Sequence, residues 1–196
     1  KKLGNYVCSD KYTCGVLRQD SFQFHPLNFM NALAHDCTTL GASIFENCKF
    51  INYGRNNGKI DSSVSNKNRM LNIQSEKIVF ATGGYGGKEI KDLKNYWLPI
   101  KTFIGVTKPI GNELQSVLKK PLGFSDNRRA GNYYRVLPGN RLSWGRGISA
   151  VGNFTPASLK RAISKEISYF FPELRNIEIE YVWSGNMAYA SHYMPY

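Results

Sequence analysis

A glycine-rich turn follows a short apolar run in segment 76–87, EKIVFATGGYGG. An apolar run of this length, 78–81, bounded by turn residues predicts a strand buried on both faces. Glycines at its end let a ligand approach the backbone closely, because no Cβ intervenes. Ligands of open α/β folds lie beyond the carboxyl ends of such strands. A plain glycine-rich turn is the alternative, since the dinucleotide-binding pattern GxGxxG occurs nowhere in the chain.

Arg135 is the side chain best suited to hold an anion. In the segment YYRVLPG it alternates with Tyr134 and Val136, so it points to one side of a predicted strand. A guanidinium binds a carboxylate through paired hydrogen bonds, which makes an anionic ligand group the natural partner. A solvent-facing strand arginine is the alternative.

The cysteines and histidines do not form a metal-binding or nucleophile pattern. They are scattered along the chain as Cys8, Cys14, Cys37, Cys48, His25, His35 and His192. No CxxC pair is followed by histidines at ligand spacing, and no Ser-His-Asp or Cys-His constellation is visible. We therefore expect no metal site, free cysteines and a cytoplasmic setting.

The net charge of +12 arises from 26 Lys and Arg against 14 Asp and Glu. Clustered cations would predict a nucleic-acid partner, but the longest basic runs are pairs such as Lys119-Lys120 and Arg128-Arg129. Dispersed charges favour a solvated surface, so we expect no nucleic-acid partner. Because no apolar stretch approaches the roughly 20 residues of a membrane helix, we also expect no membrane span.

The elements expected to position these residues fall into two regions. The first is α/β in character: a helix over 25–41, strands over 42–45, 48–53, 69–74 and 76–81, and hairpin loops over 54–68. The second is an antiparallel sheet with one long helix: strands over 101–110, 132–138, 141–147 and 177–183, and a helix over 156–171. Gly139-Asn140 predicts a tight hairpin, and Thr155 is the predicted N-cap of the second helix.

The order of these segments resembles that of the FAD-dependent oxidases of the D-amino-acid-oxidase-like superfamily, closest to the gamma-glutamylputrescine oxidase branch. The segments that carry the resemblance are HPLN…LGASIFE, EKIVFATGGYGG, LPI…TKPI, YYRVLPGNRLSWGRG, FFPEL and IEYVWSGN…MP. Together they cover nearly all 196 residues.

The resemblance implies an internal piece of a two-domain flavoenzyme. Residues 1–97 would be a partial Rossmann-like FAD-binding domain without the GxGxxG unit, 98–182 an antiparallel substrate (cap) domain, and 183–196 a return into the FAD-binding domain. The reaction implied is oxidation of a C–N bond in a small amine or amino acid, giving an imine and then an aldehyde or keto product. We expect these 196 residues alone to bind FAD weakly and to be inactive. A catalytically inactive remnant that serves as a binding or structural module is the alternative.

The resemblance also implies roles for single positions. The cofactor positions are Phe50 and Ile51 beside the adenine, Ala81, Thr82 and Gly83 beside the ADP half, and Trp183, Ser184 and Gly185 beside the flavin ring. The substrate positions are Arg135 and Tyr134. Met187 stands where the amino-acid oxidases carry an arginine for the α-carboxylate, which favours an amine or a conjugate with a distal carboxylate. His25 precedes the first helix and would approach the flavin, cap that helix or pack at its start.

Overall fold

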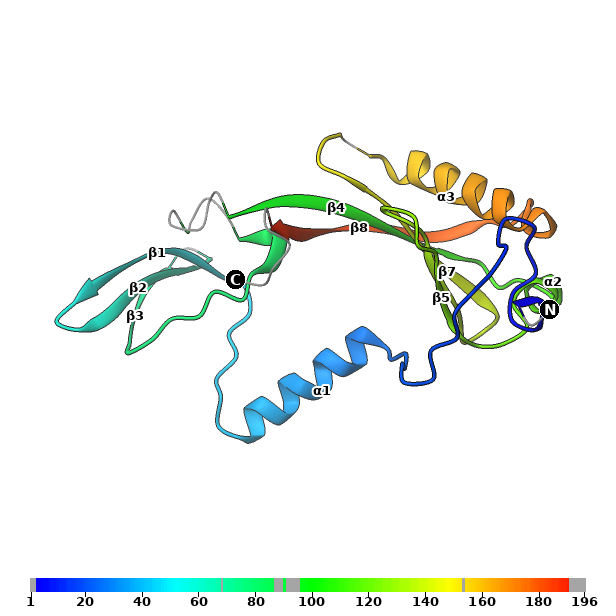
Figure 1. Ribbon diagram of the computed structural model, residues 1–196. Helices are drawn as coiled ribbons and strands as arrows, with labels where there is room; N and C mark the ends of the chain where they lie inside the picture. The colour runs from blue at the N-terminus through cyan, green and yellow to red at the C-terminus, as the bar shows by residue number, and fades with distance from the viewer. Residues whose placement is uncertain (1–2, 68, 87–89, 91–95, 153, 191–196) are drawn as a thin grey trace. The chain divides into compact units, whose positions relative to one another are not determined.

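The computed structural model describes residues 3–67, 69–86, 90, 96–152 and 154–190. The chain forms two compact units (Figure 1). Unit 1 comprises Lys1–Gln23 and Pro99–Met187, and unit 2 comprises Phe24–Leu98 and Ala188–Tyr196. Residues 191–196, which include His192, lie outside the described part.

A five-stranded sheet is the framework of unit 1, in the order β5-β6-β7-β4-β8. The strands are β4 (Trp97–Thr107), β5 (Gly123–Ser125), β6 (Tyr133–Leu137), β7 (Arg141–Ser149) and β8 (Ile179–Ala190). The pairs β5–β6, β6–β7 and β7–β4 are antiparallel. The antiparallel sheet expected in the second half of the chain is thus confirmed, with β5 added and β8 extended beyond the predicted end at 183.

The hairpin between β6 and β7 is confirmed at its predicted turn. Gly139 and Asn140 both have positive φ angles, 76° and 54°, a conformation that glycine and asparagine tolerate better than other residues. The register then runs without interruption from Leu137 opposite Arg141 to Tyr133 opposite Gly145. Successive residues of β6 therefore point to opposite faces of the sheet.

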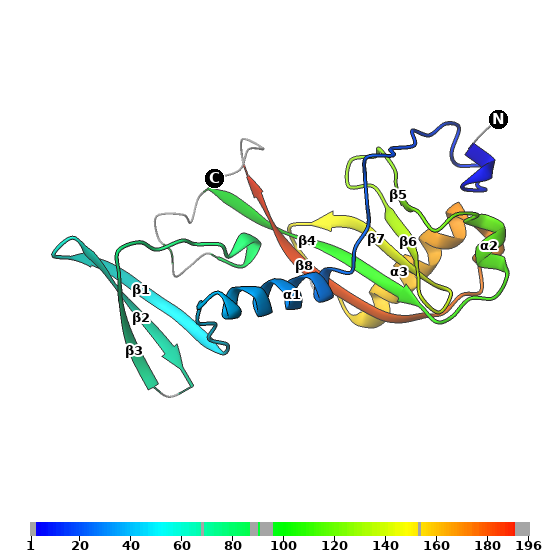
Figure 2. The same ribbon diagram turned by 90° about the horizontal axis from the view of Figure 1, so that it is seen from below.

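Helix α3 (Pro156–Phe170) lies along one face of this sheet (Figure 1; Figure 2). It begins as predicted, because the Thr155 side chain accepts a hydrogen bond from the backbone N–H of Ser158 at 3.2 Å and Pro156 occupies the first turn. Its apolar stripe is buried: Leu159, Ile163, Ile167 and Phe170. Gly105 of β4 lets the helix approach, since a Cβ there would lie 2.8 Å from Ile163 Cδ1.

The core of unit 1 lies between α3 and the sheet. Its largest fully buried side chains include Trp144, Phe171, Leu142, Leu114 and Leu174. Leu114 comes from the short helix α2 (Glu113–Val117), and Leu174 from the 3-10 helix η4 (Pro172–Leu174).

The N-terminal residues also pack in unit 1. After the 3-10 turn η1 (Leu3–Asn5), Val7 is buried in the core. The backbone N–H of Cys8 donates to the carbonyl of Val117 at 2.8 Å. The sequence-based boundary grouped these residues in 1–97 with the first region. The structure instead joins residues 1–23 to the sheet of unit 1, because their apolar side chains and backbone groups find partners there.

Helix α1 (Pro26–Thr39) opens unit 2 and confirms the predicted helix. His25 caps it: its Nδ1 accepts a hydrogen bond from the backbone N–H of Asn28 at 3.2 Å. Capping, one of the roles considered for His25, is thus observed. The strand expected over 42–45 is not formed.

Three antiparallel strands follow in unit 2: β1 (Cys48–Asn56), β2 (Lys59–Asn66) and β3 (Arg69–Ser75). The expectation of loops over 54–68 is wrong, because this stretch is mostly paired strand with a tight turn at Asn57 and Gly58, both at positive φ. The polar side chains of this segment favoured loops, although Asn-Gly is itself a strong hairpin signal.

The buried strand expected over 76–81 is not present either. These residues carry no strand assignment, and Val79 is 86% exposed. A strand buried on both faces needs paired neighbours and covering helices, and the described part of unit 2 provides neither for this segment. The glycine turn itself forms a short 3-10 helix, η2 (Gly83–Tyr85).

Candidate functional site

The face of the unit 1 sheet opposite α3 carries the residues best placed to meet a ligand. In β6 the side chain of Tyr134 is 4% exposed and packs on the α3 side, with an edge contact to Phe171 at the end of that helix. Because side chains alternate along a strand, Tyr133 and Arg135 lie on the opposite face. We call this surface the open face.

Arg135 lies on the open face between two small neighbours. It is opposite Gly123 on β5 and Ser143 on β7, and directly paired residues of antiparallel strands share a face. The side chain of Gln23 also reaches this region, with Oε1 3.5 Å from the position of a Cβ on Gly123. Its amide donates to the carbonyl of Pro121 at 2.9 Å. Arg135 is half-buried as a whole residue, and its two paired neighbours on this face are small.

Tyr133 lies across β7 on the same face and is 41% exposed. Gly145 makes this possible, because a Cβ there would lie 2.0 Å from Cε2 and 2.1 Å from Cζ of the Tyr133 ring. Beyond Gly145 the Tyr133 hydroxyl lies 3.2 Å from the Thr102 hydroxyl on β4. A glycine on one strand and a hydroxyl on the next therefore fix the position of this phenol.

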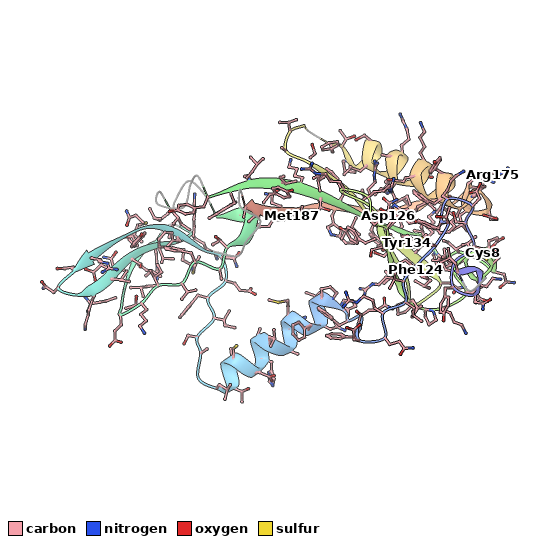
Figure 3. All side chains as sticks on the ribbon, viewed as in Figure 1. Cys8, Phe124, Asp126, Tyr134, Arg175 and Met187 are labelled. Carbon is pink, nitrogen blue, oxygen red and sulfur yellow. The ribbon has the colours of Figure 1, made fainter. Side chains whose placement is uncertain are left out.

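The two residues assigned to the substrate from the sequence, Arg135 and Tyr134, lie on opposite faces of β6. Tyr134 stacks between Phe124 and Trp144, with ring centroids 5.3 Å and 4.5 Å away. Figure 3 labels Tyr134 and Phe124 near each other in unit 1. Burial raises the pKa of the Tyr134 phenol, and the neighbouring Tyr12 raises it further. Tyr134 is thus a neutral core residue, and the open face presents Tyr133 in its place.

Sequence reasoning missed four residues of the open face: Tyr133, Thr102, Gly145 and Gln23. The alternation in YYRVL that placed Arg135 also put Tyr133 on its side, so this signal was available. The partners Thr102 and Gly145 are set by strand pairing, and Gln23 by the packing of the N-terminal segment. Those three could not be read from local pattern.

A buried polar cluster lies on the α3 side of the sheet and supports the loop between β5 and β6. The Asp126 carboxylate, almost fully buried, accepts hydrogen bonds from the Arg128 guanidinium at 2.8 Å and from the backbone N–H of Asn132 at 3.2 Å. Burial raises the pKa of Asp126, but these hydrogen bonds outweigh it and hold the pKa below its ordinary value. Glu166 of α3 pairs with Arg146 of β7 at 2.5 Å. These charges are engaged within the fold.

Two predicted cofactor positions lie on β1 in unit 2. Phe50 forms an aromatic cluster with Tyr53 and Phe80, with ring centroids 5.4 to 6.3 Å apart. The β1–β2 register skips Ile51, because Phe50 is opposite Val64 while Asn52 is opposite Ser63. Such a bulge takes one residue's peptide out of the ladder, which suits a backbone contact with a ligand base.

The glycine turn is exposed at Ala81, Thr82 and Gly83. Gly83 has a positive φ of 53°, and among the described residues no atom beyond its chain neighbours lies within 4 Å of a Cβ position there. The backbone at Gly83 is therefore open to a ligand. Phe80, which contacts Phe50, immediately precedes Ala81 in the chain, so the β1 positions and this turn lie in the same part of unit 2.

The remaining cofactor positions lie on β8. Trp183 is 48% exposed, so it is not a core aromatic of unit 1. Ser184 and Gly185 follow it in the same strand, and Met187 is partly exposed two residues later. An exposed indole beside a glycine offers a flat apolar surface of the kind that packs against a ring system.

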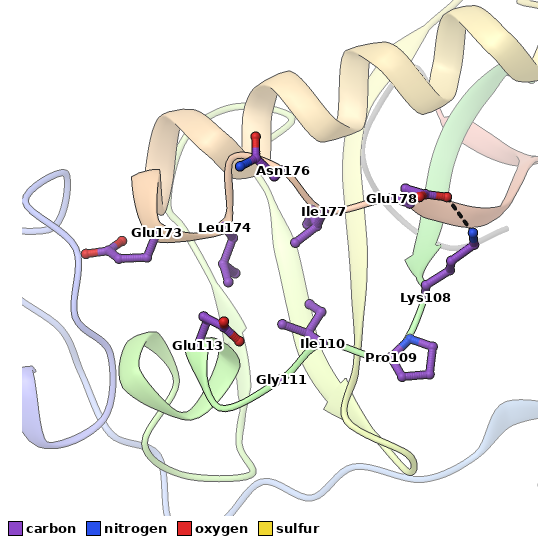
Figure 4. Close-up of a pocket in the computed structure, with 10 residues that line it drawn as sticks. All are labelled: Lys108, Pro109, Ile110, Gly111, Glu113, Glu173, Leu174, Asn176, Ile177 and Glu178. Atoms are coloured by element: carbon purple, nitrogen blue, oxygen red, sulfur yellow. Dashed lines mark ion pairs between the residues drawn. The ribbon is translucent and has the colours of Figure 1, made fainter.

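A surface hollow of about 370 Å³ lies elsewhere in unit 1, beside α2 and η4 (Figure 4). Its lining includes Glu113, Glu173 and Glu178, and Lys108 pairs with Glu178 at 2.5 Å. None of the site residues predicted from the sequence lines it. Its acidic lining also disfavours a carboxylate ligand, so we do not assign the site there.

The described residues show neither a metal-binding cluster nor a membrane-spanning helix. No group of three or more Asp, Glu, His or Cys side chains is arranged to hold a metal ion in the described residues. None of the described helices is both long enough and apolar enough to cross a membrane.

The family model and the relatives that match this chain are all oxidoreductases. A family model for FAD dependent oxidoreductases, DAO, matches residues 2–196. A probable oxidoreductase OrdL of Haemophilus influenzae is 29% identical over 189 residues, which cover 94% of this chain and 42% of that protein. Gamma-glutamylputrescine oxidoreductase of Escherichia coli is 24% identical over 191 residues, which cover 96% of this chain and 43% of that protein. The chain thus spans less than half the length of these relatives.

Solved structures share the fold. Glycine oxidase from Geobacillus kaustophilus superposes with a TM-score of 0.66 at 18% identity, over 85% of this chain and 43% of that one. L-proline dehydrogenase from P. horikoshii gives a TM-score of 0.62 at 19% identity, over 83% of this chain and 43% of that one. These likenesses confirm the fold class expected from the sequence, part of an FAD-binding fold joined to an antiparallel sheet.

Proposed function

From the premise that this chain belongs to the FAD dependent oxidoreductase (DAO) family, we propose that it supplies the substrate-binding sheet of an enzyme that oxidises a C–N bond in a carboxylate-bearing amine. The observation that carries the proposal is the position of Arg135, on the open face between Gly123 and Ser143. A guanidinium carried by a strand beside small neighbours is suited to bind a carboxylate.

The cofactor positions predicted from the sequence are the residues that would hold FAD. Phe50 and Ile51 would meet the adenine, and the backbone of Ala81, Thr82 and Gly83 would run beside the ADP half. Trp183 and Gly185, with Ser184 between them, would pack beside the flavin ring. When bound, FAD supplies the two-electron chemistry by accepting a hydride from the carbon that bears the nitrogen.

The chain's own side chains would bind and orient the substrate. Arg135 would hold a carboxylate and so fix the distance of the reacting carbon from that anchor, which contributes to catalysis through positioning. Met187 is apolar and cannot pair with a carboxylate. A single anchor at Arg135 favours an amine whose carboxylate lies away from the reacting carbon.

The name of the Escherichia coli relative supports this substrate class. That protein is a gamma-glutamylputrescine oxidoreductase, and a gamma-glutamyl amine carries its carboxylate far from the terminal amine. We therefore propose a gamma-glutamylputrescine-like substrate. Loss of the hydride leaves an imine, which water would hydrolyse to an aldehyde.

The test is reduction of the flavin in the complete gene product loaded with FAD. Under anaerobic conditions a gamma-glutamyl amine should bleach the flavin absorbance, while the same amine without its carboxylate should do so far more slowly. Oxidation of both amines at equal rates would contradict the role of the carboxylate. Failure of every amine and amino acid tried would instead support a binding or structural module.

A further inference from the structure

The hydroxyls of Tyr133 and Thr102 form a pair on the open face, 3.2 Å apart. They come from β6 and β4, which lie on either side of β7. The Tyr133 ring reaches across β7 because Gly145 has no Cβ beneath it. The partly exposed phenol is therefore held at both its ring and its hydroxyl.

A pair of hydroxyls always offers a hydrogen bond to a third group. One hydroxyl donates to the other, and the proton of the accepting hydroxyl remains to be donated elsewhere. Tyr133 and Thr102 together thus present a donor whose position the sheet fixes. A hydroxyl donor of this kind suits an uncharged acceptor such as a carbonyl oxygen.

This donor lies on the same face of the sheet as the carboxylate anchor. Tyr133 and Arg135 are two residues apart on one face of β6, a separation of about 6.6 Å along the strand. Because the Tyr133 ring reaches across β7 to Thr102 of β4, a molecule that lies across the open face from β6 toward β4 can meet both groups at once. The Arg135 guanidinium suits its carboxylate, and the hydroxyl pair suits a second oxygen further along.

We propose that the Tyr133–Thr102 pair is a specificity-determining contact that donates a hydrogen bond to an amide carbonyl of the substrate while Arg135 holds the carboxylate. The inference rests on the proposed function and narrows it to substrates that carry both groups. Discrimination by such a contact is strong, because a ligand without the carbonyl leaves the donor without its partner.

Two non-oxidisable probes separate this contact from the carboxylate anchor. Glutaramate carries a carboxylate and an amide, whereas hexanoate has the same chain length and carboxylate without the amide. Their binding to the FAD-loaded complete gene product can be measured by calorimetry and by perturbation of the flavin spectrum. Tyr133→Phe and Thr102→Val each remove one hydroxyl and leave the side-chain shape nearly unchanged.

We expect Tyr133→Phe to weaken glutaramate binding by about 5- to 10-fold, the loss of one hydrogen bond, and to leave hexanoate binding unchanged. Thr102→Val should act in the same direction, and the double variant should lose less than the sum of the two. Tyr169→Phe, which removes the hydroxyl of an exposed tyrosine on α3, should change neither. Thermal unfolding of each variant checks that the fold is retained.

The inference would be overturned if Tyr133→Phe weakened the binding of both probes equally or changed the binding of neither. The Tyr133–Thr102 hydrogen bond would then only stabilise the sheet. If Arg135→Met then weakens the binding of both probes, the proposed role of Arg135 as carboxylate anchor is retained although the inference about the hydroxyl pair fails. If the unmodified protein binds neither probe, the inference and the carboxylate anchor both fall.

Discussion

The Tyr134 ring lies parallel to the Trp144 indole across the β6–β7 pair, with ring centroids 4.5 Å apart and planes 10° from parallel. The two residues are directly opposite in the register. Phe171, at the end of α3, makes edge-to-face contacts with both rings. This cluster holds α3 on one face of the sheet and thereby leaves the other face for Tyr133 and Arg135.

Trp144→Ala should destabilise the protein strongly. The indole is fully buried, and truncating a buried tryptophan typically costs about 3–5 kcal/mol. Chemical denaturation measures the loss. Trp183→Ala, at a half-exposed tryptophan of β8, is the control and should cost much less; equal losses would place Trp144 outside the core that governs unfolding.

Gly145→Ala should displace the Tyr133 ring. The added Cβ would overlap Cε2 at 2.0 Å, and overpacking of this kind costs about 1–3 kcal/mol. Gly123→Ala is the matched control on the same face, because the nearest atom to its Cβ lies at an ordinary 3.5 Å. In a Tyr133→Ala background the cost of Gly145→Ala should largely disappear, and a cost that persists would refute the contact.

Asp126 should make stability fall in acid. Hydrogen bonds to its carboxylate hold the folded-state pKa below the ordinary value, so the stabilisation is present above about pH 4, the unfolded pKa. It is lost as pH falls through the lower folded pKa. Asp126→Asn should lower the free energy of unfolding near neutrality by about 1–3 kcal/mol. The difference in free energy of unfolding between the unmodified protein and Asp126→Asn should become smaller in acid. A difference independent of pH would contradict the stabilising role of the Asp126 carboxylate.

Arg135→Met should raise KM for a carboxylate-bearing amine by about 10- to 150-fold, which corresponds to a charge-assisted hydrogen bond of about 1.5–3 kcal/mol. A neutral amine of similar length should be much less affected. Steady-state kinetics of the FAD-loaded complete gene product provide the measurement, with exposed Arg161→Met on α3 as the control. Equal losses on both substrates would mean that Arg135 supports the sheet and does not contact the substrate.

These 196 residues alone should bind FAD weakly or not at all. GxGxxG is absent from them, and it is this motif that places the diphosphate at a helix N-terminus. Titration followed by flavin fluorescence checks the expectation. A purified 196-residue chain that stays yellow with stoichiometric flavin after gel filtration would disprove it.

Local pattern was enough where a segment's structure depends on its own residues. Thr155 and Pro156 start α3, the Gly139-Asn140 turn sets the β6–β7 hairpin, and Pro26 starts α1, as the sequence predicted. Capping, turn geometry and amphipathic periodicity act over a few residues. The family resemblance followed from the order of such segments.

Position in the fold could not be read in the same way. The apolar run 78–81 was expected in a buried strand, yet Val79 is exposed, because burial depends on neighbours that local composition does not specify. The polar segment 54–68 was expected as loops, yet pairing with β1 and β3 makes it mostly strand. Contacts between distant residues decided both.

The sequence by itself determined that Arg135 and Tyr134 occupy one strand and point in opposite directions, since alternation is a property of the extended backbone. Only the tertiary structure decided which direction is the core. Packing of α3 against Trp144 and Phe171 buried Tyr134, and that choice turned Arg135 and Tyr133 to the open face. Alternation in the sequence divides the residues of a strand between two faces, and the packing of a helix against one face decides which of them is buried.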